Sequence, residues 1–216
     1  MNLLFDLDGT LTDPGLGIAR SLQHALSALG RPVPSVPELH WCVGPPLRGT
    51  LTKLLGSSDP QMLDRALGLY RERFVSTGMF ENSVCPGVVA GLGQLSKAGR
   101  QLWVVTSKPR VYARIILDHF SLSGAFASVY GSELSGENAD KAELIRHVLS
   151  TERFSEQPHM VGDRRHDIEA AHANGLVGVG VLWGYGSRAE LEAAGADMLV
   201  ESMEQLCEWA GHPTTE

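Results

Sequence analysis

The sequence contains few cysteines and few aromatic residues, and it has no long apolar or basic run. The three cysteines are far apart and form no Cys-x-x-Cys pair, which argues against a zinc site or a redox dithiol. The formal net charge is −7, whereas a general nucleic-acid binder usually carries a basic patch. The apolar segments are too short to span a membrane. We therefore expect neither a nucleic-acid polymer nor a membrane as a partner.

The amino-terminal residues lack the basic and apolar regions of a signal peptide, because acids stand at Asp6 and Asp8. This pattern predicts a cytoplasmic protein. The 216 residues suit one large domain or two small ones and allow a substantial core. The sequence does not mark an oligomer interface, and we expect a monomer or a homodimer.

Two patterns divide the chain. Between residues 14 and 82, apolar residues recur at helical spacing and prolines separate three predicted helices. From Pro86 onward, helical segments alternate with short β-like segments, which is typical of a parallel sheet with helices on both faces. The sequence thus predicts an α/β fold, with a Rossmann-like parallel sheet core and an inserted all-helical domain. The expected strands after Pro86 are Gln101 to Val105, Ser128 to Tyr130, His159 to Val161, Val177 to Leu182, and Met198 to Val200.

The helical stretch is too long for a loop, so we expect it to form a small domain of its own. Its predicted bounds are residues 14–82, and the discontinuous core would comprise residues 1–13 and 83–216. The insert leaves the core directly after Asp6 and Asp8. A domain hinged at this point can close over the two carboxylates.

The segment Asp6–Thr10 reads Asp-Leu-Asp-Gly-Thr and follows a short apolar run. Two carboxylates at the end of a buried strand require a cation, a proton or a ligand nearby, because burying charge is costly. Thr106 and Asp163 also follow apolar runs. Ligands of open parallel sheets bind at the carboxyl ends of the strands, so we expect these residues to meet in one crevice.

The order Asp, Thr, Lys and Asp-x-x-x-Asp predicts magnesium-dependent phosphoryl transfer. Asp6 is the candidate nucleophile and would form an aspartyl-phosphate. Asp8 is the candidate general acid and base. The carboxylates of Asp6 and Asp163, with the backbone carbonyl of Asp8, would bind Mg²⁺, which prefers oxygen ligands.

Four further residues complete the predicted catalytic site. Asp167 would share a helix face with Asp163, four residues earlier, and would hold a metal-bound water or fix Lys141. Lys141 would neutralise charge on the phosphate and on Asp6, with Lys108 as the alternative. The Thr106 hydroxyl and the Ser107 backbone N–H would bind phosphate oxygens.

Other residues are predicted to shape the substrate site. Gly9 permits a sharp exit of the backbone from the strand, and the Thr10 hydroxyl can orient Asp8. Both are expected near the bound substrate, together with Ser107. In the helical insert, Arg48 is the candidate substrate-binding residue, and a plain surface charge is the alternative.

The sequence carries four motifs in order: Asp6 to Thr10, then Thr106, then Lys141, and finally Gly162 to Asp167. They resemble the four motifs of the haloacid dehalogenase superfamily of phosphatases, and the resemblance covers nearly the whole chain. The resemblance implies that the helical insert is a cap domain and that the substrates are small phosphorylated metabolites. Residues 181–187 and 194–197 look like phosphoglycolate phosphatases, whereas residues 43–47 look more like a 5′-nucleotidase-like branch. The expected substrate is therefore phosphoglycolate or a nucleoside 5′-monophosphate.

Two departures from the family pattern occur. Arg164 stands where many relatives have Ser, and Ser107 stands where many have Asn. An aspartate at position 8 fits phosphatases and phosphomutases rather than dehalogenases. The alternatives to a phosphatase are a β-phosphoglucomutase-like enzyme and a non-catalytic binding protein on the same fold.

Overall fold

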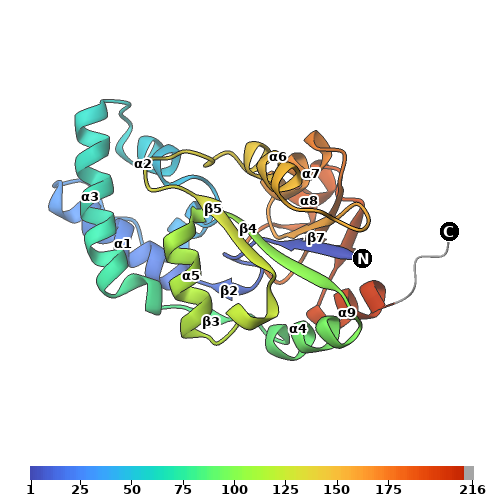
Figure 1. The fold of residues 1–216 in the computed structure, drawn as a ribbon. Helices are drawn as coiled ribbons and strands as arrows, with labels where there is room; N and C mark the ends of the chain where they lie inside the picture. Colours follow the sequence, from blue (N-terminus) through green and yellow to red (C-terminus); the bar gives the residue numbers. More distant parts are fainter. Residues whose placement is uncertain (212–216) are drawn as a thin grey trace. The chain divides into compact units, whose positions relative to one another are not determined.

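The computed structural model describes residues 1–211, and the chain divides into two compact units (Figure 1). One unit comprises residues 1–12 and the chain from residue 84 onward, and the other comprises residues 13–83. The chain crosses between them at β2 (Thr12–Asp13) and β3 (Ser83–Val84), which pair as a two-stranded sheet. The hydrophobic pattern does not reveal β2 and β3, because two residues are too few to show a period.

The larger unit is built on a six-stranded sheet in which every neighbouring pair is parallel. The strand order is β5-β4-β1-β6-β7-β8. The chain therefore builds outward from the central β1 to β5 on one side and then returns to β6 on the other. This reversal makes the carboxyl ends of β1 and β6 the switch point at which such sheets bind ligands. The strands are β1 (Asn2–Phe5), β4 (Gln101–Pro109), β5 (Ser128–Ser132), β6 (His159–Gly162), β7 (Val177–Val181) and β8 (Met198–Val200).

Helices cover both faces of this sheet, which confirms the predicted α/β class (Figure 1). Leu3 and Phe5 of β1 belong to one core cluster, with α4, α5 and α9, while Leu4 belongs to the other, with α6 and α7. Successive strand residues point to opposite faces, and both faces are covered, so all four residues of β1 are buried. The helices are α4 (Val88–Lys97), α5 (Arg110–His119), α6 (Lys141–Thr151), α7 (Arg165–Ala173), α8 (Arg188–Ala193) and α9 (Met203–Gly211).

The strand β4 extends four residues beyond its predicted end at Val105 and includes Thr106. Its pairing with β5 shifts register between Thr106 and Pro109. Ser107 and Lys108 lie in this irregular stretch, and such irregularities re-aim side chains beside functional sites. Thr106 therefore lies within the strand, immediately before the shift, rather than at the strand's end.

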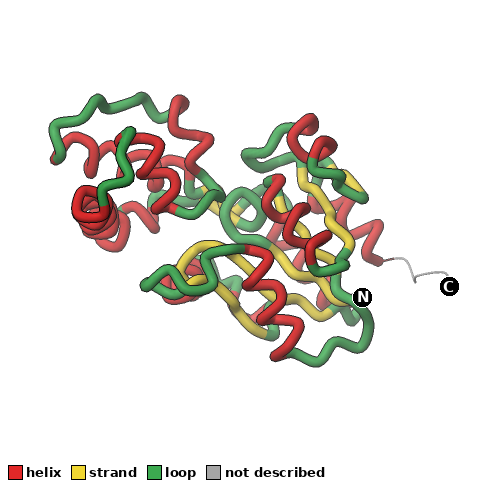
Figure 2. Tube along the Cα trace, turned by 90° about the horizontal axis from the view of Figure 1, so that it is seen from above, coloured by secondary structure: helices red, strands yellow, loops and turns green. Residues whose placement is uncertain are grey.

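The smaller unit consists of helices and loops apart from the end residues of β2 and β3 (Figure 2). Its α-helices are α1 (Gly15–Ala28), α2 (Leu47–Leu55) and α3 (Pro60–Ser76), and its short 3-10 helices are η1 (Pro37–Cys42) and η2 (Gly78–Phe80). Asp59 caps α3 by accepting hydrogen bonds from the backbone N–H groups of Gln61 and Met62, and Pro60 suits the first turn. Across residues 1–211, the helices lack the combined length and apolar character needed to cross a membrane.

Candidate active site

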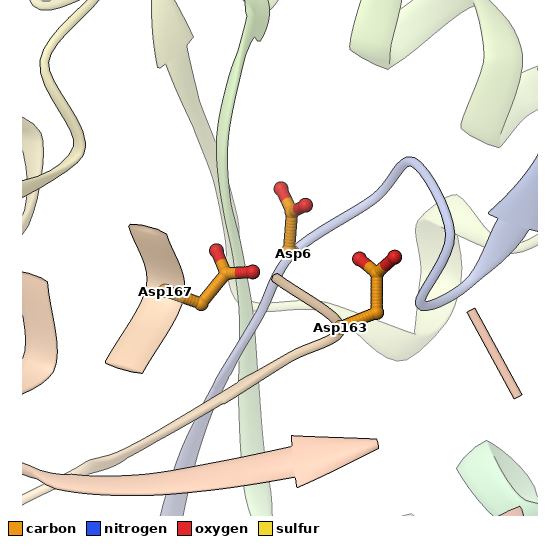
Figure 3. A group of neighbouring side chains, drawn as sticks. All are labelled: Asp6, Asp163 and Asp167. Carbon is orange, nitrogen blue, oxygen red and sulfur yellow. The ribbon is translucent and has the colours of Figure 1, made fainter. Parts of the chain in front are cut away.

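Three buried carboxylates meet at the switch point, those of Asp6, Asp163 and Asp167. Their ligand atoms lie within 4.8 Å of one another. Asp6 directly follows β1, and its backbone N–H donates to the Val161 carbonyl of β6 at 2.9 Å, which fixes the two strand ends together. Figure 3 shows the three side chains coming from separate segments, with their carboxylates on the same side of the site.

Asp163 and Asp167 converge in a way that the sequence spacing does not predict. The helix α7 begins at Arg165, so Asp163 lies in the turn before it and the two acids do not share a helix face. Asp167 is the third helical residue, and its Oδ2 accepts from the Arg164 backbone N–H at 3.0 Å. A side chain at Gly162 would overlap the Asp167 carboxylate, so this position requires glycine.

Lys141 lies among the carboxylates. Its Nζ donates to Asp6 Oδ1 at 2.8 Å and to the Val105 carbonyl at 3.1 Å, and it lies 2.8 Å from Asp167 Oδ1. Burial by itself lowers the pKa of Lys141, but the Asp167 and Asp6 carboxylates reverse this and hold the pKa above its usual value. Lys141 is therefore a permanent positive charge that offsets part of the negative charge at the site.

Lys108 binds the other carboxylate of the first motif. Its Nζ lies 2.8 Å from Asp8 Oδ2, and both side chains are buried. Burial raises the pKa of Asp8 above its usual value, even though the Lys108 charge acts to lower it. Within residues 1–211, the buried Asp8 Oδ1 has no hydrogen-bond partner. The two candidate lysines are thus both at the site, each beside a different aspartate.

Thr10 bonds to Asp163 rather than to Asp8. Its hydroxyl donates to Asp163 Oδ1 at 3.3 Å, so the expectation that it orients Asp8 is not what this geometry provides. Gly9 has φ of +88°, and a side chain there would overlap the Asp163 carboxylate. Gly9 is thus required for both its left-handed backbone and its close approach to Asp163.

The remaining predicted residues lie in strand β4 or in the smaller unit. Thr106 is buried, and its Oγ1 accepts from the Lys108 backbone N–H at 3.3 Å. The Ser107 carbonyl accepts from the Ser132 hydroxyl at 2.9 Å. Arg48 is in the smaller unit, where it forms an exposed ion pair of 2.6 Å with Asp64. The predicted contact between Arg48 and substrate stays a prediction.

The sequence motifs do not include the turn after β7, which the structure places at the site. Trp183 Nε1 donates to the Thr10 carbonyl at 2.9 Å, and the Tyr185 backbone N–H donates to Asp163 Oδ2 at 2.7 Å. One signal was present: this Trp-Gly-Tyr-Gly segment follows a predicted parallel strand, and the carboxyl ends of such strands carry the ligand site.

The site fits a divalent cation. Three carboxylates crowd within 4.8 Å, and in the part of the chain that the structure describes Lys141 alone pairs with two of them, so negative charge is in excess. Burial, followed by the nearby Asp167 and Asp6, raises the pKa of Asp163 well above its usual value. A bound cation would remove this electrostatic cost, and hard oxygen donors suit Mg²⁺ or a similar ion. The cluster could therefore hold a metal ion.

Comparison with known proteins identifies the class. The sequence model of the family described as haloacid dehalogenase-like hydrolase matches residues 3–181. The chain belongs to this family, which confirms the resemblance read from the four motifs. Over 96% of both chains it also resembles the crystal structure of a predicted phosphatase from Clostridium acetobutylicum, with a TM-score of 0.91 and 38% identity.

Curated relatives narrow the class. A 5′-nucleotidase of Pseudomonas aeruginosa is 46% identical over 193 residues, covering 89% of this chain and 87% of the relative. The tyrosine-protein kinase PtkA of Mycobacterium tuberculosis is 40% identical over 186 residues, or 85% of this chain and 62% of PtkA. A phosphoglycolate phosphatase of Cupriavidus necator is 30% identical over 94% of this chain and 90% of its own. The chain is a phosphoric monoester hydrolase of the haloacid dehalogenase-like family.

Proposed function

We propose that the protein hydrolyses small phosphomonoesters through a phosphorylated Asp6, with Mg²⁺ held by Asp6, Asp163 and the backbone carbonyl of Asp8. Asp167 would fix Lys141. The observation that carries the proposal is that Asp6 and Asp8, the two acids of the first motif, have different charged partners. Asp6 lies beside Lys141 and the other two acids, whereas Asp8 lies 2.8 Å from Lys108 and keeps one carboxylate oxygen without a hydrogen-bond partner in residues 1–211.

In the first step, an Asp6 carboxylate oxygen forms a bond to phosphorus while the ester oxygen leaves. Asp8 in its protonated form gives its proton to that leaving oxygen. Bound Mg²⁺ would offset the repulsion between the phosphate and the Asp6 carboxylate. Lys141, which donates a hydrogen bond to Asp6, supplies further positive charge beside the Asp6 carboxylate.

In the second step, the Asp8 carboxylate takes a proton from water, whose oxygen bonds to phosphorus. The bond between phosphorus and Asp6 breaks, and inorganic phosphate leaves. Thr106 and the backbone N–H of Ser107 are proposed to bind the phosphate oxygens, because both lie where β4 shifts its register. Gly9 and Thr10 are proposed to border the same phosphate.

The proposed substrate class is nucleoside 5′-monophosphates. The relative named 5′-nucleotidase is 46% identical, whereas the phosphoglycolate phosphatase of Cupriavidus necator is 30% identical. Phosphoglycolate is the second choice. Both are small metabolites with one terminal phosphate, so the site residues are compatible with either.

A panel assay tests this proposal. Phosphate release is measured from nucleoside 5′-monophosphates, phosphoglycolate and sugar phosphates, with Mg²⁺ and with EDTA. We expect release that requires Mg²⁺ and is fastest with a nucleotide. Asp6→Asn should abolish it, while Asp118→Asn, at an exposed position, should not. Mg²⁺-dependent release by Asp6→Asn at the normal rate would show that another residue is the nucleophile.

A transferase is the second candidate, favoured by the 40% identity to a protein named as a tyrosine kinase. Such an enzyme would pass the phosphoryl group to an acceptor other than water, and a β-phosphoglucomutase-like reaction is the other form of this chemistry. Because PtkA extends well beyond the matched region, its activity is only a candidate here. Incubation with labelled ATP, or with glucose 1-phosphate, would reveal phosphotyrosine or isomerised sugar instead of free phosphate. The intact acids and Lys141 argue against a non-catalytic binding protein.

A further inference from the structure

We propose that the turn formed by residues 183–186, directly after β7, is a positioning element that orients the Asp163 carboxylate for cation binding. The inference rests on the proposed function, because it concerns the Mg²⁺ site of that reaction. It assigns a task to Trp183, Gly184 and Tyr185, none of which contributes a side chain to the three-carboxylate cluster.

Hydrogen bonds hold both oxygens of the Asp163 carboxylate. Oδ1 accepts from the Thr10 hydroxyl at 3.3 Å, and Oδ2 accepts from the Tyr185 backbone N–H at 2.7 Å. The two donor segments are themselves joined, because Trp183 Nε1 donates to the Thr10 carbonyl at 2.9 Å. The contacts therefore form a closed ring that runs from Thr10 to Asp163, on to the turn, and back to Thr10.

Backbone packing restricts the same carboxylate. A Cβ added at Gly184 would overlap Asp163 Cβ and would lie 2.5 Å from both Asp163 Oδ2 and the Gly9 carbonyl oxygen. A Cβ added at Gly186 would overlap the Asp163 carbonyl oxygen. Asp163 is fully buried between these glycines, so its side chain has little freedom to turn.

The ring of hydrogen bonds holds Asp163 against the repulsion between the three carboxylates. Asp6, Asp163 and Asp167 repel one another, and the ion pairs of Lys141 within residues 1–211 are with Asp6 and Asp167. Asp163 has no lysine of its own among these contacts, so donors from Thr10 and Tyr185 hold it in place. Donors that orient a metal-binding carboxylate typically affect metal affinity by about 10- to 100-fold. The turn is thus expected to act on cation affinity rather than on substrate binding.

Replacement of Gly184 by Ala tests the inference. The methyl group must displace Asp163, so we expect Mg²⁺ and Mn²⁺ to bind about 10- to 100-fold more weakly in calorimetric titrations. KM for the phosphomonoester, measured at saturating Mg²⁺, should change little. The matched control is Gly124→Ala, because Gly124 is exposed and has no atom within 4 Å of an added Cβ. This control should bind both cations like the wild type.

Trp183→Phe gives an independent second test. It keeps an aromatic ring at the edge of the core but removes the indole N–H that reaches Thr10. We expect a smaller loss of cation affinity in the same titrations, and Trp209→Phe serves as its control. If Gly184→Ala does not fold, Trp183→Phe alone decides the question.

The possible outcomes separate this inference from the proposed function. If the wild type binds Mg²⁺ and requires it, but the folded variants bind Mg²⁺ as tightly as the wild type, the turn does not position Asp163. If the wild type releases phosphate without any divalent cation and binds none, the cation part of the proposed function fails, and this inference fails with it. Reduced affinity in Gly124→Ala as well would show a general effect of added methyl groups and would overturn the assignment.

Discussion

Asp8 and Lys108 form a buried ion pair, with Asp8 Oδ2 and Lys108 Nζ 2.8 Å apart. Asp6, only two residues earlier, is 2.8 Å from a different lysine, Lys141. From the sequence, Lys141 is the candidate for the lysine of the phosphate site and Lys108 is the alternative. In the structure, Lys108 pairs with Asp8 and Lys141 pairs with Asp6. The two acids therefore have different electrostatic surroundings, which is what a nucleophile and an acid–base group require.

Replacement of Asp8 by Asn should affect substrates according to their leaving groups. A nucleoside or alkyl oxygen needs a proton when it leaves, so its phosphorylation of Asp6 should slow by about 10²- to 10⁴-fold. The p-nitrophenolate ion leaves without a proton, so its release in the first turnover should fall far less. Rapid-mixing measurement of that first turnover checks the prediction. Equal losses for both substrates would contradict acid catalysis by Asp8.

Replacement of Lys141 by Met should destabilise the cation-free protein strongly. It leaves Asp6 and Asp167 buried without their positive partner, and breaking a buried ion pair from one side typically costs about 3–5 kcal/mol. Urea denaturation in EDTA measures the loss. The control is Lys97→Met, at an exposed position of α4, which should change the free energy of unfolding little. A similar loss in both variants would contradict the special role of Lys141.

The sequence predicts most of the core because its signals there are local. Short apolar runs mark β6, β7 and β8, and their predicted bounds differ from the observed ones by at most one residue. Their parallel order then brings Asp6 and Asp163 together, as the alternation of strands and helices implies. Lys141 reaches the same site because it is the first residue of α6, which packs near β4.

What the sequence does not predict depends on contacts between distant residues. The Thr10 hydroxyl donates to Asp163, which is 153 residues away, and no local pattern encodes that choice. The register shift after Thr106 depends on pairing with β5. Trp183 is 173 residues from Thr10, so their hydrogen bond is visible only in three dimensions.

Removal of the divalent cation should destabilise the wild type clearly and Asp163→Asn only slightly. Mg²⁺ should stabilise the wild type, by about 2.7 kcal/mol at a hundred times its Kd, because it binds the folded cluster. Asp163→Asn removes one of three crowded negative charges, so in EDTA it should be at least as stable as the wild type and gain little from Mg²⁺. Thermal unfolding with and without Mg²⁺ measures both effects. Equal stabilisation of the two proteins by Mg²⁺ would place the cation elsewhere.

Glu81 should make the smaller unit sensitive to acid. Its carboxylate accepts from Arg73 at 2.8 Å and 3.1 Å and from Arg20 at 2.6 Å. The Arg73 hydrogen bonds are the main cause that lowers the pKa of Glu81, so its stabilising effect is present above the unfolded pKa and is lost as pH falls through the folded pKa.

Replacement of Glu81 by Gln tests this effect. At about pH 7 the free energy of unfolding of the variant, measured by urea denaturation, should be about 1–2 kcal/mol below that of the wild type. This difference should shrink toward about pH 3. Glu72→Gln, at an exposed position of α3, is the control. A difference that stays constant between these pH values would show that charge is not its source.

Replacement of Arg48 tests whether a positively charged side chain of the smaller unit binds the substrate. Its ion pair with Asp64 is exposed on both sides, and such pairs contribute only about 0–1 kcal/mol, so Arg48→Ala should fold normally. If Arg48 binds the substrate's negative charge, KM of the variant should be about 10-fold higher, the value of one charge-assisted hydrogen bond, with kcat unchanged.

Asp64→Asn should not raise KM, because it leaves Arg48 charged and removes its competing partner. Arg65→Ala, an exposed arginine of the same unit, is the control. An unchanged KM in Arg48→Ala would make Arg48 a surface charge only, and recognition of the substrate would then depend on other residues.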